Sequence, residues 1–266
     1  MYSSSSVSKR HVMVPILAVV AIQFLLNIPS VFSLNMTNAY LQHKCFVSQG
    51  KYKPGSEYEK DLIDIIDSLP LTSNFTRGFE MSSSGEGPNY VSVTHQCRGD
   101  SYGAKCRSCY STTISELRRR CPRYKGGIIW YDQCLLVISA VNYFGKIDYD
   151  NNFCISNAKK FSVGHYSNVP WGIFIDNLTT IAISEKNPTE LYAAGERKIG
   201  RDKVYGMVQC TQDLSSKGCL ECVTSNSVNF QKCMFYKRGA RVIGRSCNIR
   251  YEFYPFVAVG PNYLKT

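Results

Sequence analysis

Histidine is scarce in this chain, and its scarcity limits the chemistry that the protein can perform. The four histidines among the 266 residues are His11, His43, His95 and His165. None is spaced with a serine, a cysteine or a carboxylate in a recognised catalytic pattern. Gly-x-Ser-x-Gly, a phosphate-cradling glycine loop and His-Glu-x-x-His are absent as well. Because catalytic triads assemble in space, these absences argue against an enzyme without excluding one, and they leave no motif for a cofactor.

Long apolar runs are also lacking, apart from one near the N-terminus. An apolar run over 12–26 follows a basic start and ends in small residues, which predicts a secretory signal over residues 1–33. A membrane anchor is the alternative, but Gln23 interrupts the run, which is short against the roughly 20 apolar residues of a spanning helix. The C-terminal residues 251–266 contain aromatic residues, prolines and a lysine, so we expect neither a membrane span nor a lipid-anchor tail there.

Acidic residues are fewer than basic ones. The chain has 20 Asp and Glu against 31 Lys and Arg, a net charge of +11, which falls to +9 once residues 1–33 are removed. A basic secreted protein favours acidic polysaccharide, phosphate-bearing or membrane-surface partners, although solubility alone also explains the charge. The run Arg118-Arg119-Arg120 suits a solvated helix C-terminus. No nucleic-acid-binding motif is present, so we expect no nucleic acid partner.

Cysteine, by contrast, is abundant and ordered. Twelve cysteines form two sets of six in the same order, with Cys-x8-Cys-x2-Cys inside each set and none left over. Four of the six equivalent pairs lie 113 residues apart. This register indicates an internal duplication. We expect two modules, over residues 38–144 and 149–256, that pack together because the link between them is short. The first set is Cys45, Cys97, Cys106, Cys109, Cys121 and Cys134, and the second is Cys154, Cys210, Cys219, Cys222, Cys233 and Cys247.

The cysteines of a secreted chain are most simply a disulfide framework, because an even count at repeated spacing forms disulfides in an oxidising compartment. Zinc is one alternative, since Cys106-x2-Cys109 and Cys219-x2-Cys222 each resemble half a zinc site. Each module has only one such pair, and no histidine stands at ligand spacing. A redox-active pair is the other alternative, but it needs a free, activated thiol. We therefore expect structural disulfides and no metal.

The hydrophobic pattern predicts an α+β fold for each module. Apolar residues at helical period over 58–69 predict an amphipathic helix that Pro70 closes. The other expected helices cover 106–121, 171–183 and 219–233. Expected strands include 90–97, 127–133 and 135–144, with 203–210, 240–246 and 248–256 as their counterparts. Short links between strands favour an antiparallel sheet of about five strands with two helices on one face, and three disulfides tying helix to sheet.

Three sequons predict that the chain is a glycoprotein. They begin at Asn35, Asn74 and Asn177, whereas the proline after Asn187 excludes a fourth. Asn177 lies within a helix-like stretch.

The doubled Cys-x8-Cys-x2-Cys set after a signal sequence resembles the plant cysteine-rich repeat secretory proteins, over about residues 38–256. Their module is the ginkbilobin-homologous domain, also called domain of unknown function 26. The resemblance implies a five-stranded antiparallel sheet with two helices and secretion into the apoplast. It also implies a pairing that spacing alone leaves open, because six cysteines permit 15 connectivities. That pairing is Cys45–Cys121, Cys97–Cys106 and Cys109–Cys134, then Cys154–Cys233, Cys210–Cys219 and Cys222–Cys247.

The resemblance also implies a candidate sugar site. The single-module family member ginkbilobin binds mannose through an Asn, an Arg and a Glu, and the last two match Arg241 and Glu252 here. Ile155 stands in place of the Asn. The first module has Phe46, Ile128 and Ser139 at the three positions, so we expect no sugar contact there. Arg and Glu can bind sugar hydroxyls through charge-assisted bonds. The alternative is a cross-strand ion pair between Arg241 and Glu252.

Two hypotheses of function follow for a secreted, non-enzymatic binding protein. The first is a lectin-like defence or stress-response protein that binds mannose-type glycans through Arg241 and Glu252. The second is an interaction module that binds receptor ectodomains or itself and has no sugar site. An exposed apolar patch on the sheet, without a polar sugar pocket, would favour the second.

Overall fold

The computed structural model describes residues 38–73, 75–160, 169–185, 190–199, 202–260 and 263–265. All of these lie in one compact unit, Thr37–Thr266. The expected signal over 1–33 lies outside the described residues. Among the helices that are described, none is both long enough and apolar enough to cross a membrane.

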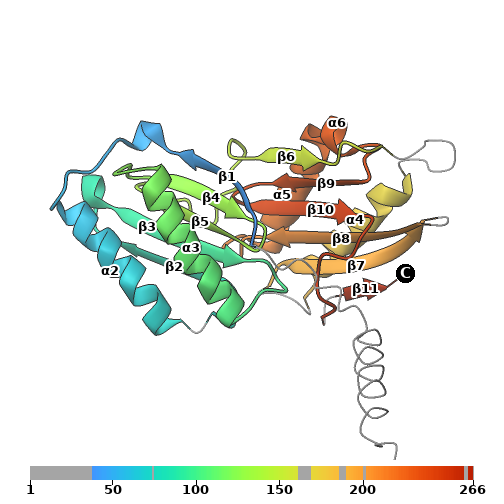
Figure 1. Cartoon of the computed structure of the whole chain (residues 1–266), viewed down its shortest axis with the longest axis horizontal. Coiled ribbons are helices and arrows are strands. Elements are labelled where there is room, and N and C mark those ends of the chain that lie inside the picture. The colour runs from blue at the N-terminus through green and yellow to red at the C-terminus, as the bar shows by residue number, and fades with distance from the viewer. Residues whose placement is uncertain are drawn as a thin grey trace, which may run out of the picture. The chain divides into compact units, whose positions relative to one another are not determined.

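The first module is a five-stranded antiparallel sheet covered by two helices on one face (Figure 1). The strand order is β1-β4-β5-β3-β2. The helices pack their apolar side chains on this sheet in one core that includes Leu62, Leu117 and Leu136. The prediction of an α+β module is therefore confirmed. The elements are β1 (Tyr40–Cys45), α2 (Glu57–Thr72), β2 (Phe79–Ser84), β3 (Val91–Cys97), α3 (Ala104–Arg120), β4 (Gly127–Tyr131) and β5 (Cys134–Ser139), with short 3-10 turns at Val47–Gln49 and Gly87–Asn89.

Helix α2 runs through Pro70, so the prediction that this proline closes the helix is wrong by two residues. Ser56 caps the N-terminus of the helix, and its side chain accepts a hydrogen bond from the Glu59 backbone N–H. Pro70 has no N–H to give to the carbonyl of Ile66 four residues earlier. The Tyr110 hydroxyl of α3 donates to that carbonyl instead, at 3.0 Å. A neighbouring helix thus satisfies the group that the proline leaves open.

The second module repeats this plan with one additional strand. Its sheet has the order β11-β7-β8-β10-β9-β6, and β11 pairs with β7 in parallel, whereas the other pairs are antiparallel. The expected helix over 219–233 is divided at Phe230 into α5 and α6. Neither β11 nor this break was predicted. The elements are β6 (Phe153–Ser156), α4 (Val169–Ala182), β7 (Tyr192–Ile199), β8 (Asp202–Cys210), α5 (Ser216–Asn229), α6 (Gln231–Met234), β9 (Gly239–Ile243), β10 (Cys247–Glu252) and β11 (Tyr263–Lys265).

Six disulfides tie these elements together, three in each module. They join Cys45 to Cys121, Cys97 to Cys106, Cys109 to Cys134, Cys154 to Cys233, Cys210 to Cys219 and Cys222 to Cys247. This is the pairing that the resemblance implies. In the first module the bridges join β1, β3 and β5 to α3 or to the residue that follows it. Crosslinks of this kind typically contribute 2–4 kcal/mol each.

The two modules also contact one another. A separate apolar cluster contains Ile128, Trp130 and Val137 of the first module with Ile243 and Phe153 of the second. Trp130 donates its indole N–H to the carbonyl of Gly244 at 3.1 Å. The expectation that the modules pack together is confirmed, and the contact lies on the sheet face opposite the helices.

Candidate functional site

The second module brings the three positions of the expected sugar site together. Ile155 on β6 pairs in register with Arg241 on β9, and Arg241 pairs with Arg250 on β10. Glu252 follows Arg250 by two residues and therefore lies on the same face of the sheet. Ile155, Arg241 and Glu252 thus occupy neighbouring strands on one face, as a shared site requires.

Arg241 and Glu252 are, however, engaged by other side chains of the protein. Arg241 donates to the carboxylate of Asp132 at 2.6 Å, and Arg250 donates to the same Asp132 oxygen at 3.0 Å. The Nε–H of Arg250 donates to the carboxylate of Glu252 at 3.1 Å. Asp132 belongs to the turn between β4 and β5 of the first module. The two ion pairs with Asp132 therefore join one module to the other.

Two further charged residues of the first module extend this group. Arg98 contacts Asp132 at 3.0 Å and Asp100 at 2.6 Å. The backbone N–H of Ala258 donates to Asp100 at 2.9 Å and so attaches the C-terminal segment. We call the six residues the junction cluster. Its three guanidinium groups and three carboxylates balance in charge: Arg98, Asp100, Asp132, Arg241, Arg250 and Glu252.

Burial and charge act in opposite directions within the junction cluster. Burial raises the pKa of Asp132, but the guanidinium groups of Arg250, Arg98 and Arg241 outweigh it and hold that pKa below its usual value. Burial together with the charge of Arg250 lowers the pKa of Arg241. The pKa of Glu252 is raised, because burial outweighs the attraction of Arg250. Asp132 is thus the carboxylate that all three guanidinium groups share.

The side chains of Arg241 and Glu252 are 17% and 10% exposed, so little of either faces solvent. The cross-strand pair proposed from the sequence differs from the pairs seen among the described residues, which join Arg241 to Asp132 and Glu252 to Arg250. Sequence reasoning missed Asp132, Arg98 and Arg250. Two-residue alternation from Glu252 could have indicated Arg250. Nothing in the sequence points to Asp132, because it comes from the other module.

The corresponding face of the first module carries no charge at these positions. Phe46 and Ile128 are buried in the apolar cluster that contains Trp130. Ser139 is buried too, and Gln49 donates to its hydroxyl at 3.1 Å. The equivalents of Arg241 and Glu252 in the first module are therefore part of its packing.

Two glutamines form a reciprocal pair of hydrogen bonds between the modules. Gln96 donates to the carbonyl of Cys210 at 3.0 Å, and Gln209 donates to the carbonyl of Cys97 at 2.9 Å. Gln96 and Gln209 are 113 residues apart, as are Cys97 and Cys210. Equivalent residues thus contact equivalent partners, so the duplication is also a local pseudo-twofold arrangement.

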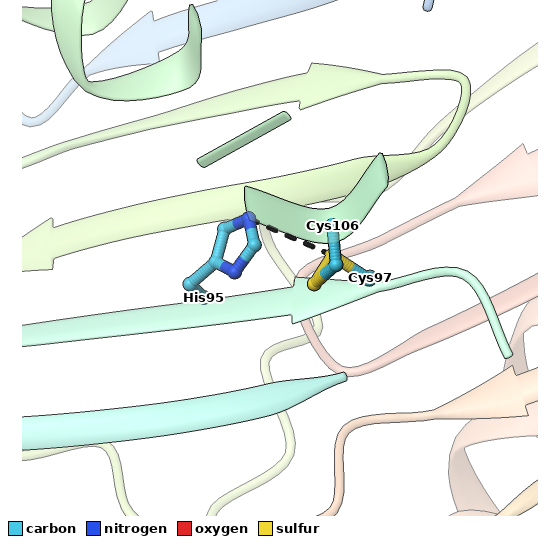
Figure 2. Close-up of side chains that lie close together, drawn as sticks. All are labelled: His95, Cys97 and Cys106. Atoms are coloured by element: carbon cyan, nitrogen blue, oxygen red, sulfur yellow. Dashed lines mark hydrogen bonds between the residues drawn. A yellow bond between two sulfur atoms is a disulfide. The ribbon is translucent and has the colours of Figure 1, made fainter. Parts of the chain in front are cut away.

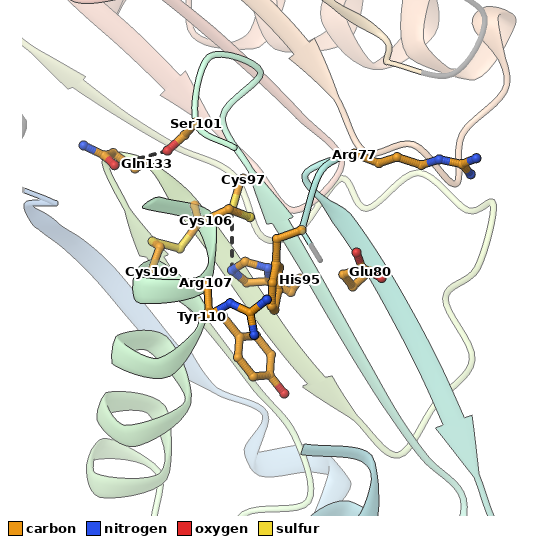
Figure 3. The surroundings of a disulfide bond; sticks show 12 residues. Arg77, Glu80, His95, Cys97, Ser101, Cys106, Arg107, Cys109, Tyr110 and Gln133 are labelled. Carbon is orange, nitrogen blue, oxygen red and sulfur yellow. Dashed lines mark hydrogen bonds between the residues drawn. A yellow bond between two sulfur atoms is a disulfide. The ribbon is translucent and has the colours of Figure 1, made fainter. Parts of the chain in front are cut away.

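His95 lies beside the Cys97–Cys106 disulfide in the first core, between β3 and α3 (Figure 2). Its Nε2 is 3.9 Å from the Cys97 sulfur, and its Nδ1 has no hydrogen-bond partner among the described residues. The ring packs against Tyr110 of α3, with the centroids 5.1 Å apart (Figure 3). Complete burial lowers the pKa of His95 to about 3.

This histidine and the two sulfurs are the only group of possible metal ligands in the described part of the chain. The two sulfurs form a disulfide with each other, so neither is a thiolate. Cysteine binds metal as the thiolate, so these two sulfurs are not metal ligands in this state. A hydrogen bond of 2.6 Å joins the His43 Nδ1 and the Tyr40 hydroxyl. His165 lies outside the described residues.

Of the three sequons, only Asn177 lies in a described segment. It is exposed on α4, and the Thr179 hydroxyl donates to the carbonyl of Ile175 at 2.8 Å. Asn35 and Asn74 lie outside the described residues.

Comparisons with known proteins agree with this architecture. The family described as salt stress response/antifungal (Stress-antifung) matches residues 44–141 and 153–254. Cysteine-rich repeat secretory proteins 17 and 18 of Arabidopsis thaliana are 56% and 51% identical to the chain over 279 residues, and in both cases 100% of each chain is covered. The tandem DUF26 ectodomain of the Arabidopsis thaliana cysteine-rich receptor-like protein PDLP8 has a TM-score of 0.67 at 19% identity, covering 81% of this chain and 98% of its own. That of PDLP5 has a TM-score of 0.65 at 20% identity, covering 81% and 99%.

Proposed function

Because the chain belongs to the Stress-antifung (DUF26) family and to its cysteine-rich repeat secretory proteins, we propose that it recognises other proteins in the extracellular space, without catalysis. The protein is secreted. Its two modules act as one unit, held together by the junction cluster, the reciprocal glutamines and the apolar cluster around Trp130. Receptor ectodomains of the same fold, or a second copy of this chain, are the partners that we propose.

The observation that favours this proposal over sugar binding is the engagement of Arg241 and Glu252 inside the protein. A sugar competing for Arg241 must displace Asp132, and the displaced carboxylate would then face Arg98 and Arg250 alone. Hydrogen bonds to charged groups contribute about 1.5–3 kcal/mol each, and a sugar hydroxyl must replace that contribution. The geometry therefore favours a stabilising role for these residues over a ligand-binding role.

Mannose-type glycan binding in defence or stress response is the second candidate function. The observation in its favour is the convergence of Ile155, Arg241 and Glu252 on adjacent strands. The partly exposed Ile155 cannot supply the directional hydrogen bond that an Asn gives.

Calorimetric titration separates the two candidates. We would titrate the deglycosylated mature protein with mannose and with a mannan oligosaccharide, alongside Arg241→Ala and the exposed-arginine control Arg118→Ala. We expect no saturable heat, and a lower Tm in Arg241→Ala but not in Arg118→Ala. Saturable heat that disappears only in Arg241→Ala would contradict our proposal and show that the protein is a lectin.

A direct test of protein recognition uses two purified probes. Biolayer interferometry would measure binding of the PDLP5 and PDLP8 ectodomains, and sedimentation would measure self-association. We expect saturable binding in at least one of these measurements. No binding to either ectodomain and no self-association would contradict the proposed function.

A further inference from the structure

A group of basic side chains gathers at one edge of the second sheet. Strand β6 is the edge strand there, and α6 packs beside β6 and β9 (Figure 1). The chain that leaves β6 runs antiparallel to the chain that enters β9, and the Cys154–Cys233 disulfide joins β6 to α6. We call the basic residues of these segments the basic edge: Lys159, Lys160, Lys232, Lys237 and Arg238.

Two lysines of the basic edge stand directly opposite one another. Lys160 and Lys237 are the partners of an isolated antiparallel bridge. The Cβ atoms of such a cross-strand pair lie about 4.5–5.5 Å apart, and like charges in this arrangement are destabilising. This pair of ammonium groups therefore lowers the stability of the fold.

The first module contains the same bridge with a favourable pair. Its partners are Lys51 and Tyr124, which lie 109 and 113 residues before Lys160 and Lys237, the offsets of the flanking cysteines. The Lys51 ammonium is 4.6 Å from the centroid of the Tyr124 ring, which is a cation–π contact. The second module has a lysine in place of this aromatic partner. The duplicated fold thus does not require two lysines at the bridge.

The lysines of the basic edge are not neutralised inside the protein. Within the described part of the chain, none of the four forms an ion pair or a side-chain hydrogen bond. Arg238 reaches Asp202 only at 3.9 Å, and the two side chains are 42% and 39% exposed. Its equivalent in the first module, Lys125, instead donates to the carbonyl of Pro88 at 2.6 Å. The basic edge is therefore an exposed positive surface without internal counter-ions for its lysines.

We infer that the basic edge binds an acidic polysaccharide, a chain whose successive uronate carboxylates supply the anions that the lysines lack. Hydrogen bonds between ammonium and carboxylate groups are charge-assisted and stronger than neutral ones. A carboxylate between Lys160 and Lys237 replaces their repulsion with two attractions. A polymer also presents several carboxylates on one chain, so that each further contact is intramolecular. This binding is independent of the protein recognition proposed above.

Two observations favour a polysaccharide over other polyanions. The protein is secreted, whereas the anionic lipids that attract basic segments belong to the cytoplasmic leaflet. Tyr236, directly before Lys237, is 37% exposed, and the negative face of an aromatic ring can meet the C–H groups of a sugar. The equivalent residue in the first module is Arg123, held in the same turn conformation with φ of 62° against 60° for Tyr236. The second module alone thus combines an exposed ring with the facing lysines at this turn.

A pair of matched oligosaccharides tests the inference on the intact mature protein after deglycosylation. One is a decamer of galacturonic acid, and the other is the same decamer with its carboxyl groups methyl-esterified, which keeps the sugar chain and removes the charge. Calorimetric titration at low salt gives Kd. We expect the acid decamer to bind at least tenfold more tightly than the ester, and to bind less tightly as the salt concentration rises.

The variant Lys237→Tyr gives the bridge the pair found in the first module. It should weaken binding of the acid decamer at least threefold, and Lys160→Gln combined with Lys237→Tyr at least tenfold. Lys237→Tyr should not lower the Tm, because a cation–π contact replaces a repulsion. Lys53→Gln combined with Lys60→Gln is the matched control, since it removes the same two charges from exposed positions of the first module and should leave Kd unchanged.

Several results would overturn the inference. They are equal binding of acid and ester, no binding of either, unchanged binding by the double variant of the bridge, or an equal loss in the matched control. Equally tight binding of a glutamate decapeptide would replace the polysaccharide with an acidic polypeptide. Binding to phosphatidylserine vesicles without binding to the acid decamer would replace it with a lipid surface.

Discussion

The two modules share a fold but differ in which face of the sheet carries a charged or titratable side chain. On the face between the modules, the first has Ile128 and Val137 where the second has Arg241 and Arg250. On the helix face the order is reversed, since the first has His95 where the second has Val208. The second module therefore carries two arginines, and the first a histidine, at positions where the other copy has an aliphatic side chain.

The turns before β5 and β10 also differ in charge between the modules. Asp132 in the first module corresponds to Arg245 in the second. Asp132 accepts from the arginines of the other module, whereas Arg245 contacts Asp148 of the linker at 3.1 Å. The duplicated fold is thus kept by cysteines and apolar residues, while differences between the copies fix how they join.

Removal of Asp132 should have the largest effect on this comparison. Asp132→Ala leaves Arg98, Arg241 and Arg250 without their shared carboxylate, and breaking a buried ion pair in this way costs about 3–5 kcal/mol. Urea denaturation of Asp132→Ala and of the exposed control Asp64→Ala measures the difference. Equal midpoints for the two variants would mean that the charges do not join the modules.

The second largest effect should be a difference between the two cores in how their stability depends on pH. The pKa of His95 is about 3 when folded, against an ordinary value of 6.5, so the unfolded chain binds one proton more between these values. Stability is then lost as the pH falls below about 6.5, by about 1.4 kcal/mol per pH unit.

The matched comparison is the variant His95→Val, which gives the first core the residue type found at the equivalent position 208. At pH 4.5 the wild type should have lost roughly 2–3 kcal/mol more than this variant, relative to pH 7. Parallel pH profiles of unfolding free energy would show that the histidine is not held neutral.

Removal of either reciprocal glutamine should destabilise the protein, because both modules use the equivalent glutamine in the same contact. Gln96→Ala and Gln209→Ala each remove a hydrogen bond to a buried carbonyl, which costs about 1–2 kcal/mol. Gln96→Ala also removes the bond that its side-chain oxygen accepts from the Gln212 backbone N–H, at 3.2 Å. Thermal unfolding should therefore show a loss for both variants, and the larger loss for Gln96→Ala. A loss confined to one glutamine would contradict the local twofold arrangement.

Arg119 should show the smallest effect. It forms an exposed pair with Glu116 on α3 at 2.7 Å, and exposed pairs of this kind contribute little. Arg119→Ala should leave the Tm unchanged, and a large drop would show that the basic end of α3 supports the fold.

Sequence reasoning succeeds where the interaction is local or periodic. The 113-residue register gives the modules, and helical and alternating patterns give most helices and strands. It fails where a distant group intervenes. Pro70 stays inside α2 because Tyr110 occupies the carbonyl of Ile66, and β11 forms because the chain returns beside β7. The partners of Arg241 are unpredictable for the same reason, since Asp132 lies 109 residues away on another module.

A double-mutant cycle between Asp132 and Arg241 tests most directly whether the second module's charges serve to join the modules. The variants are Asp132→Asn, Arg241→Ile, which introduces the residue found at the equivalent position 128, and their combination. The free energy of unfolding is measured for all four proteins. The account predicts a coupling of about 1 kcal/mol or more, because the first change removes the partner that the second needs. Additive losses, with no coupling between the two sites, would contradict it.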